Sequence, residues 1–553
     1  MNIRTDRNDP FDLDCARADE VNRENLRCIL ADNAKTAYGR ALGFDRIGDD
    51  LAYRKRVPMI TYEDVGGLID RMYRGETGLL TAYPIRQFIH TSGTSGRPKH
   101  IPLSEEALRR YGNIKDRINR ETMGLDPACR RLQLVTYRTD PSAPPEQDTL
   151  FSIANERNLY GNGWLDPEEY VGGYRMYFQP EMTSFFYPKL WAALLEPKVG
   201  TIESPFLYDH LLFFRYLEEH WRQLLEDIRQ NRISAPRGIP ETVRAYLLSL
   251  PRDPARLRDV EAQCEAGFDG IARRLWPELR AVCGIRGSVY SAEDAALEYY
   301  TRGVPRHFFC LVSSECFMGI PLRMDEAVYA LMPRSAFFEF LPYGTGEGKP
   351  GQEGESAGET LLPHELEIGK DYEIIITNFS GLYRYHTWDV VRVEDYYGRS
   401  PMVSFRLRRN LALNLCGEKY DSLSLQHAGT LLSERLGLRE CSIALDTESV
   451  PGRYLCFAEA DGTPDRSAVR RGQRELDRVL CALNSEYDDL RKLMCIAAPV
   501  FGFAAPGSHL RVKQLGDSAA EQNKPLQIIR NQKQLDAMRS MVILSSDEEG
   551  GTP

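Results

Sequence analysis

Apolar residues recur along the chain at spacings that change from one region to the next. Up to about Leu80 the spacing predicts helices, with loops around Gly43 and Pro58. From Tyr208 to Ile228 a helical stripe of apolar residues returns, made of Phe213, Leu217, Trp221, Leu224 and Ile228. A stripe of this kind is typical of a long helix that packs one face on a core.

A different pattern begins near Trp276 and continues to Asp395. Short segments that are β-branched or aromatic and bounded by turns predict strands there. These segments are His307 to Val312, Val328 to Met332, Ala336 to Leu341, Tyr372 to Thr377 and Val390 to Glu394, and Met402 to Leu407 adds one more. The stretch Tyr343 to Gly358 is rich in Gly and Glu and is predicted to be an exposed loop.

Beyond about Asn410 the composition changes to a smaller αβ pattern. It predicts strands at Cys441 to Leu445 and Tyr454 to Ala458 and a helix at Arg466 to Glu486. We therefore expect an α/β protein with a large N-terminal domain of β-sheets flanked by helices, residues 1–407, and a smaller αβ domain, residues 408–544. Residues 545–553 are acidic and small and are predicted to form a disordered tail.

Composition narrows the class of protein. A chain of 553 residues is too long for one ordinary core, and its net charge of -10 argues against a nucleic-acid binder, which needs a basic face. The twelve cysteines include no Cys-x-x-Cys pair and are expected to be reduced thiols. The N-terminus lacks the apolar core of a signal peptide, and no apolar run is long enough to span a bilayer. We expect a cytoplasmic monomer or homodimer without membrane partners.

The segment Gln87 to Ile101 carries the most chemistry. It predicts a short strand, a glycine-rich loop and a second extended piece, followed by Ser104 as the N-cap of a helix running towards Thr122. The loop reads Thr91-Ser92-Gly93-Thr94-Ser95-Gly96-Arg97-Pro98-Lys99. Glycine amides and hydroxyl groups can donate to phosphate oxygens, and Lys99 adds a positive charge. It is not a Walker-type loop, because proline precedes the lysine and histidine follows it. A flexible surface loop is the structural alternative.

This loop resembles the nucleotide loop of the acyl-adenylate-forming superfamily, in which it clasps the β- and γ-phosphates of ATP. Two further segments resemble the Gretchen-Hagen-3 family of acyl acid amido synthetases. One opens with Trp276-Pro277 and leads through Tyr299-Tyr300 to Leu311 to Ile320, and the other is Thr377 to Val390. The resemblance implies a ligase that uses ATP and Mg²⁺ to convert a small carboxylic acid into an acyl-adenylate. The acyl group then passes to an amine, expected to be that of an amino acid, and the C-terminal domain moves between the two half-reactions.

Glu315 is the predicted magnesium ligand, because a carboxylate at the end of a strand suits this hard cation. A glutamate neutralised by a nearby arginine is the alternative. The resemblance implies that Ser313, Ser314, Phe317 and Gly319 line the adenine and α-phosphate region. It also implies that Asp389 accepts from the ribose hydroxyls and that Tyr383, in the element before it, contributes to binding the nucleotide.

The resemblance extends to the region between the domains and beyond it. Arg408 is expected to contact the ribose at the hinge, and Lys524 to stabilise the α-phosphate as the mobile lysine, catalytic together with Lys99. An ordinary surface lysine is the alternative for Lys524, because Asn523 replaces the usual aromatic residue. Trp388 stands where the family usually has glycine, and His386 where plant members usually have arginine.

Two other functions fit the same motifs. One is transfer of the acyl group to coenzyme A or to a carrier-protein thiol, which the loop and the metal glutamate do not exclude. The other is a binding or scaffold protein on a decayed synthetase fold, against which the intact loop, Glu315 and Asp389 argue. The identity of the acid is not encoded in a motif, because its pocket is built from scattered side chains.

Overall fold

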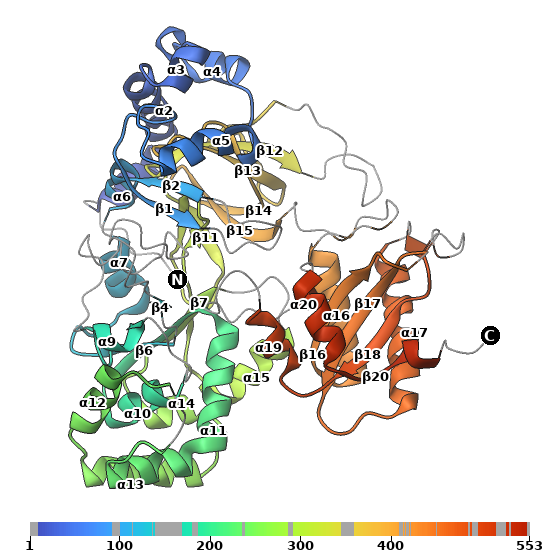
Figure 1. Ribbon diagram of the computed structural model, residues 1–553. Coiled ribbons are helices and arrows are strands. Elements are labelled where there is room, and N and C mark those ends of the chain that lie inside the picture. The colour runs from blue at the N-terminus through green and yellow to red at the C-terminus, as the bar shows by residue number, and fades with distance from the viewer. Residues whose placement is uncertain are drawn as a thin grey trace.

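A computed structural model of the chain describes residues 9–90, 100–112, 114–134, 137–138, 169–179, 186–234, 238–285, 291–343, 359–408, 413, 415, 420, 422–449, 451–484, 487–488, 491, 496–515, 527–529 and 532–549. In this part the chain forms β-sheets flanked by helices, and its C-terminal part has a sheet of its own (Figure 1). The predicted α/β class is confirmed. No helix in the described part is both long and apolar enough to cross a bilayer.

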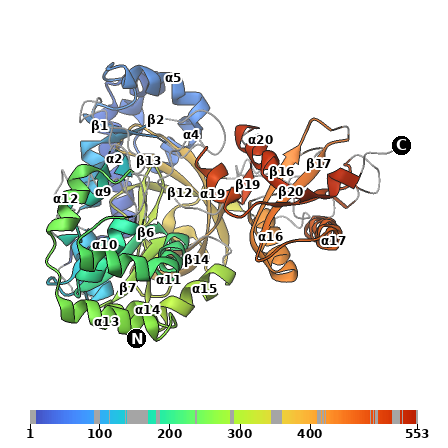
Figure 2. The same cartoon turned by 60° about the horizontal axis from the view of Figure 1, so that its bottom comes forward.

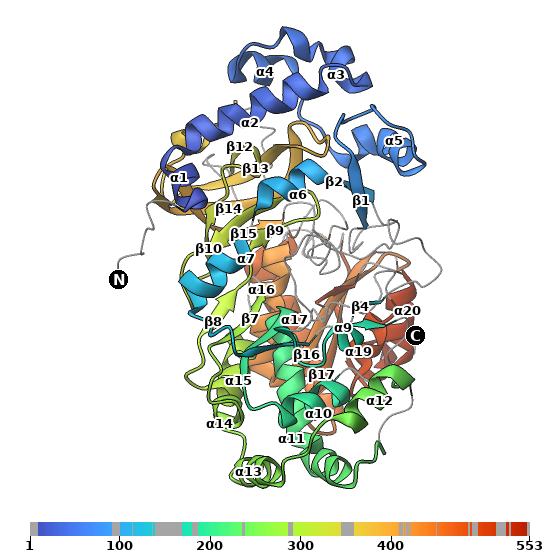
Figure 3. The ribbon, with the colours of Figure 1, turned by 90° about the vertical axis from the view of Figure 1, so that its left-hand side faces the viewer.

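The N-terminal region is helical, as the sequence predicts. Its helices are α1 (Pro10–Ala16), α2 (Ala18–Asn33), α3 (Ala37–Leu42), α4 (Asp50–Arg56) and α5 (Tyr62–Tyr73). Helix α3 ends where Gly43 adopts a left-handed φ of 62°, which costs glycine little. Helix α2 crosses strand β12 (Ala336–Tyr343) in Figure 3. The buried amide of Asn22 donates to the carbonyl of Phe338 and accepts from its N–H, so polar contacts fix the helix on the strand.

The largest sheet is antiparallel throughout, with the strand order β12-β13-β14-β15-β11-β10-β9. Its other strands are β9 (Leu311–Val312), β10 (Phe317–Pro321), β11 (Val328–Leu331), β13 (Asp371–Asn378), β14 (Tyr385–Tyr397) and β15 (Ser400–Arg408). Strand β14 bulges, because Ile375 pairs with His386 while Glu373 pairs with Val390. The hydroxyl of Thr387 closes this bulge by donating to the carbonyl of Ile374 at 2.7 Å.

A second sheet is parallel, in the order β3-β6-β7-β8. Its strands are β3 (Arg130–Gln133), β6 (Val199–Phe206), β7 (Ala281–Ile285) and β8 (Arg306–Phe308). Helix α11 (Leu207–Gln230) lies along β6 and β7 (Figure 2), and all five residues of its predicted stripe are at most 5% exposed. The other elements of this region are α7 (Ile114–Arg117), a π-helical turn (Ile118–Met123), β4 (Tyr137–Arg138), α9 (Tyr174–Tyr177), β5 (Phe178–Gln179), α10 (Tyr187–Leu195), α12 (Glu241–Ser249), α13 (Pro254–Glu265), α14 (Ile271–Leu275) and α15 (Ser291–Thr301).

The C-terminal part folds around the sheet β19-β16-β17-β18-β20. Its elements are α16 (Ser422–Leu436), β16 (Leu438–Asp446), β17 (Arg453–Ala460), α17 (Arg466–Leu483), β18 (Val500–Ala504), α19 (Ser508–Lys513), β19 (Ile528–Ile529), α20 (Gln532–Ser540) and β20 (Val542–Ser545). The large hydrophobic core of the N-terminal part has no described member beyond Val403, and the main C-terminal core begins at Leu413. The two parts therefore have separate cores.

The predicted disordered tail is wrong for its first residues. Ser545 ends strand β20, and Ser546–Glu549 form a 3-10 turn. The carboxylate of Asp547 accepts hydrogen bonds of 2.8 and 3.0 Å from the guanidinium of Arg453 on β17. This ion pair and the pairing of β20 with β18 order residues 545–549. Their acidic composition alone does not reveal these contacts. Residues 550–553 lie outside the described part.

Candidate functional site

The predicted phosphate loop connects the two strands of a hairpin. Strands β1 (Ile85–His90) and β2 (His100–Ser104) are antiparallel, and His90 pairs with His100 at the open end. The predicted strand-loop-strand arrangement is therefore confirmed at both flanks of the loop. Its predicted binding residues Thr91, Ser92, Gly93, Thr94, Ser95, Gly96 and Lys99 lie outside the described residues, so their roles stay predictions.

Ser104 caps the helix after this hairpin, as predicted. Its Oγ accepts from the N–H of Ala107 at 3.1 Å, and helix α6 (Glu105–Tyr111) follows. The helix is shorter than the sequence suggests, because Gly112 adopts a φ of 62° and interrupts it well before Thr122.

One turn joins the hairpin to the predicted metal glutamate. The hydroxyl of Ser104 donates to the carbonyl of Phe379 at 2.9 Å. The adjacent Asn378, at the end of β13, donates its side-chain amide to the carbonyl of Glu315 at 2.8 Å. The Oδ1 of Asn378 also accepts from the N–H groups of Ser380 and Leu382. The base of the phosphate loop and the backbone of Glu315 are thus fixed to the same buried turn.

Glu315 lies between β9 and β10 and is only 9% exposed. Its Oε1 is 3.5 Å from the hydroxyl of Tyr385, a long contact, and it forms no ion pair with any described residue. The alternative of a neutralising arginine is therefore not found in this part of the chain. A buried carboxylate without a counter-charge is unfavourable, and a bound cation would offset that cost.

These surroundings fit magnesium. The described residues contain no cluster of three or more His, Cys, Asp or Glu side chains, so Glu315 would supply a single carboxylate. Magnesium is commonly held by one or two carboxylates and completes its shell with water and substrate phosphates. A site of one buried glutamate beside a phosphate loop matches this preference.

The four residues predicted to line the adenine and α-phosphate region form two pairs. Ser313 and Ser314 lie in a turn, and Phe317 and Gly319 lie in a strand. The N–H of Ser313 donates to the carbonyl of Cys316 at 2.9 Å, which closes the turn that contains Ser314 and Glu315. The buried Oγ of Ser313 has no hydrogen-bond partner among the described residues, as expected of a group that serves a ligand. Phe317 and Gly319 belong to strand β10. The ring of Phe317 packs on Tyr111, and a Cβ on Gly319 would lie 3.0 Å from the carbonyl oxygen of Ala330. These two residues shape the strand.

The two residues predicted to contact the ribose, Asp389 and Arg408, lie on the paired strands β14 and β15. Asp389 is 6% exposed, and its register partner on β15 is Arg408, the last residue of that strand. The N–H of Asp389 donates to the hydroxyl of Thr387 at 3.1 Å, which holds the bulge of β14. Trp388 occupies the bulge with a φ of 63°. Glycine adopts this conformation most easily, which gives a physical reason for the glycine that the family usually has there.

The side chain of Tyr383 packs in the core, and its predicted nucleotide role stays a prediction. Its side chain is fully buried, its hydroxyl donates to the carbonyl of Leu80 at 2.6 Å, and its ring stacks on Tyr38. Burial raises the pKa of this hydroxyl well above its usual value. The side chain therefore belongs to the core. Tyr385, two residues later, contacts Glu315 instead, because Arg384 interrupts the extended backbone with a φ of 46°.

Two residues that position Glu315 were not identified from the sequence. Asn378 and Tyr385 lie within the Thr377 to Val390 motif, but no spacing rule connects either one to Glu315. Asn378 could have been noticed in the sequence as a polar residue directly after the predicted strand Tyr372 to Thr377. Lys524 lies outside the described residues, and for Arg408 only the backbone register is described.

Comparison with known proteins finds similarity along most of the chain. Three protein-family models match the chain in order: the GH3 family N-terminal domain at residues 7–306, the GH3 family central domain at residues 329–408 and the GH3 family C-terminal domain at residues 424–533. A probable indole-3-acetic acid-amido synthetase GH3.4 of Oryza sativa subsp. japonica is 31% identical over 490 residues, which cover 82% of this chain and 76% of that protein. The indole-3-acetic acid-amido synthetase GH3.6 of Arabidopsis thaliana is 29% identical over 476 residues, 80% of this chain and 76% of that protein.

Solved structures show the same fold. The AtGH3.15 acyl acid amido synthetase in complex with 2,4-DB superposes with a TM-score of 0.80 at 24% identity, covering 99% of this chain and 98% of that one. A 2-hydroxyisobutyryl-CoA ligase in its postadenylation state gives a TM-score of 0.52 at 12% identity, covering 95% and 91% of the two chains. The predicted adenylate-forming architecture is confirmed by both.

Proposed function

The chain belongs to the GH3 family, and from this membership we propose that it is an ATP-dependent acyl acid amido synthetase. It joins a small carboxylic acid to the amino group of an amino acid through an acyl-adenylate. The two plant proteins described above, GH3.4 of Oryza sativa and GH3.6 of Arabidopsis thaliana, are named as amido synthetases, and their similarity extends over most of this chain. Within the chain, the observation that supports the proposal best is Glu315, a buried carboxylate without an ion pair among the described residues, held beside the base of the phosphate loop.

The proposed reaction has two steps. An oxygen of the acid attacks the α-phosphorus of ATP, the bond to the β-phosphate breaks, and pyrophosphate leaves. The amine nitrogen then attacks the acyl carbonyl of the adenylate, loses a proton, and AMP leaves. The acid and the phosphates are both anionic, so the task of the protein is to hold them together and to neutralise charge.

The chain offers a residue for each part of this task. The amides and hydroxyls of residues 91–96 and the ammonium of Lys99 hold the β- and γ-phosphates. Ser313 and Ser314 face the α-phosphate and adenine, while Asp389 accepts from the ribose hydroxyls beside Arg408. Lys524 approaches the α-phosphate when the C-terminal domain closes, and reopening admits the amine.

Magnesium at Glu315 would supply positive charge beside the phosphates of ATP. Asn378 fixes the backbone of Glu315, and the Tyr385 hydroxyl steadies its carboxylate without neutralising it. A cytoplasmic location also belongs to the proposal. The ten cysteines of the described part are all free, which suits a reducing compartment.

A product analysis separates this function from its alternatives. The chain is incubated with ATP, a panel of carboxylic acids and either mixed amino acids or coenzyme A, and the products are identified by mass spectrometry. We expect N-acyl amino acids and AMP. Thioesters without amides would assign the chain to the thiol ligases, and ATP binding without any pyrophosphate release would favour a scaffold.

A further inference from the structure

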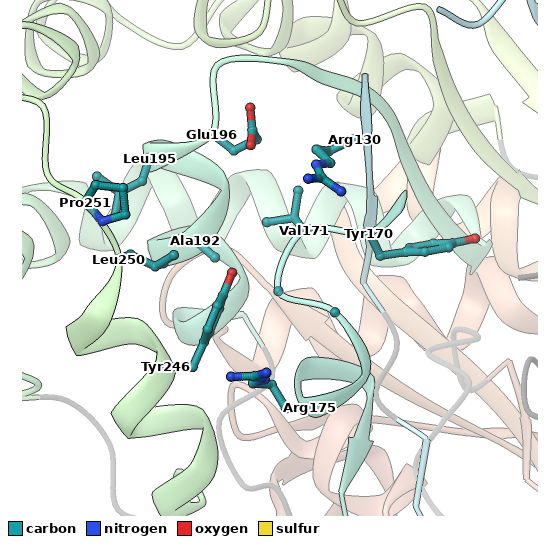
Figure 4. Close-up of a pocket in the computed structure, with 12 residues that line it drawn as sticks. Arg130, Tyr170, Val171, Arg175, Ala192, Leu195, Glu196, Tyr246, Leu250 and Pro251 are labelled. Carbon is teal, nitrogen blue, oxygen red and sulfur yellow. The ribbon is translucent and has the colours of Figure 1, made fainter. Parts of the chain in front are cut away.

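A cavity of about 340 Å³ lies away from the site described above (Figure 4). It sits at the amino-terminal edge of the parallel sheet, where Arg130 begins β3 and Glu196 shortly precedes β6. Ser313 to Glu315 instead lie between β9 and β10 of the antiparallel sheet. None of the residues that line the cavity belongs to the candidate site described above. The volume is within the usual range for small-molecule pockets.

Two opposite charges lie at one end of this cavity. Figure 4 shows the guanidinium of Arg130 and the carboxylate of Glu196 at the same end. The Arg130 side chain has no hydrogen bond or ion pair within the described ranges. One oxygen of Glu196 accepts from the N–H of Lys198 at 2.9 Å, and no ion pair joins Glu196 to Arg130 in the same ranges. A ligand group that carries both charges could contact the two side chains at once.

The rest of the lining is mixed, with apolar side chains on one side and a third charged residue, Arg175, at the far end. Ala192, Leu195 and Leu250 form one side of the cavity in Figure 4. At the far end the guanidinium of Arg175 stands 5.0 Å from the ring centre of Tyr246, a cation–π contact that ties α9 to α12. The cavity therefore combines a doubly charged end with an apolar wall.

We propose that this cavity binds a free α-amino acid with an apolar side chain, at a site separate from the reaction site. The carboxylate of the ligand pairs with Arg130 and its ammonium group with Glu196. Its side chain packs against Ala192, Leu195 and Leu250. This goes beyond the proposed function, which requires an amino acid only at the reaction site, where the acyl-adenylate forms.

Isothermal titration of the full chain with L-leucine, without ATP, tests the site. We expect saturable binding that weakens at least about tenfold for leucinamide, which lacks the carboxylate, and for N-acetylleucine, which lacks the ammonium group. Arg130→Gln and Glu196→Gln should each weaken leucine binding by a similar factor. Arg280→Gln is the matched control, because this exposed arginine precedes β7 at the same edge and does not line the cavity.

The same variants decide whether the site is separate. Thermal unfolding should show that they fold as the parent does, since neither Arg130 nor Glu196 is fully buried. In amide synthesis, Arg130→Gln should leave the KM of the acceptor amino acid unchanged. The proposal is overturned if leucine does not bind the parent chain, if neither substitution affects binding, or if the acceptor KM rises in parallel. Acid-dependent pyrophosphate exchange needs no amino acid, so it reports failure of the proposed function independently.

Discussion

The indole of Trp388 stacks on the imidazole of His386, with ring centroids 4.8 Å apart and ring planes 18° apart. The Nδ1 of His386 lies 2.7 Å from Oε1 of Glu373, whose side chain is buried. A left-handed φ costs a residue other than glycine about 1–2 kcal/mol, and an aromatic pair contributes about 0.5–1.5 kcal/mol. The stack therefore offsets much of the strain in the bulge that presents Asp389.

Two substitutions separate strain from stacking at Trp388. Trp388→Ala loses the stack and keeps the strain, whereas Trp388→Gly loses the stack and relieves the strain. We expect the glycine variant to be more stable than the alanine variant by about 1 kcal/mol. Chemical denaturation measures the difference. An alanine variant as stable as the glycine variant would show that the left-handed conformation is not strained.

Removing one hydroxyl at a time distinguishes the two tyrosines near the site. Tyr385→Phe should raise the Mg²⁺ concentration for half-maximal pyrophosphate exchange, because the carboxylate of Glu315 loses its neighbour. Tyr383→Phe should leave that concentration unchanged. It should lower the free energy of unfolding by about 1–3 kcal/mol, because the buried carbonyl of Leu80 loses its donor. The opposite pattern would support a nucleotide role for Tyr383.

His307 on β8 is buried, and its ring nitrogens have no hydrogen-bond partner among the described residues. Burial, together with the nearby charge of Arg131, lowers the pKa of His307 to about 3. The unfolded chain binds a proton at this histidine below about pH 6.5, while the folded chain does not until about pH 3. Stability should therefore fall as the pH drops through this window, by about 1.4 kcal/mol per pH unit from this residue.

Replacing His307 tests that pH dependence. His307→Leu fills a similar space without a titrating group, so the slope of unfolding free energy against pH between 6.5 and 5 should decrease by about 1 kcal/mol per pH unit. Urea denaturation at several pH values measures the slope. An unchanged slope would mean that His307 is protonated in the folded protein.

Periodicity predicts the elements of this protein well where one face is buried. The helical stripe from Phe213 to Ile228 is the buried face of α11, and the strands near Ala336, Tyr372 and Met402 form in the large sheet. Strand β10 was not predicted, because Phe317–Pro321 contains glycine and proline, which are uncommon in strands. It forms a strand because it pairs with β9 on one side and β11 on the other. The order of residues 545–549 depends on Arg453, about ninety residues earlier, which no local pattern reveals.

The motifs of the candidate site can be read from the sequence, but the contacts between them cannot. Glu315, Asp389 and Arg408 can be located from sequence, and the register brings Asp389 and Arg408 opposite each other. The contact between Tyr385 and Glu315 depends on a break in the backbone at Arg384, which is held by a buried ion pair with Glu339. In a regular strand, alternate residues such as Tyr383 and Tyr385 point to the same face. The sequence pattern therefore gives no sign of the break that separates the two side chains.

Acid-dependent exchange of labelled pyrophosphate into ATP tests the central claim most directly, because it reports acyl-adenylate formation without any acceptor. We predict exchange that requires one or more acids of the panel and falls about 100-fold or more in Glu315→Gln and in Lys99→Ala. Glu326→Gln, an exposed glutamate after β10, should exchange as the parent does. Exchange that needs no acid, or that survives both substitutions undiminished, would contradict the account.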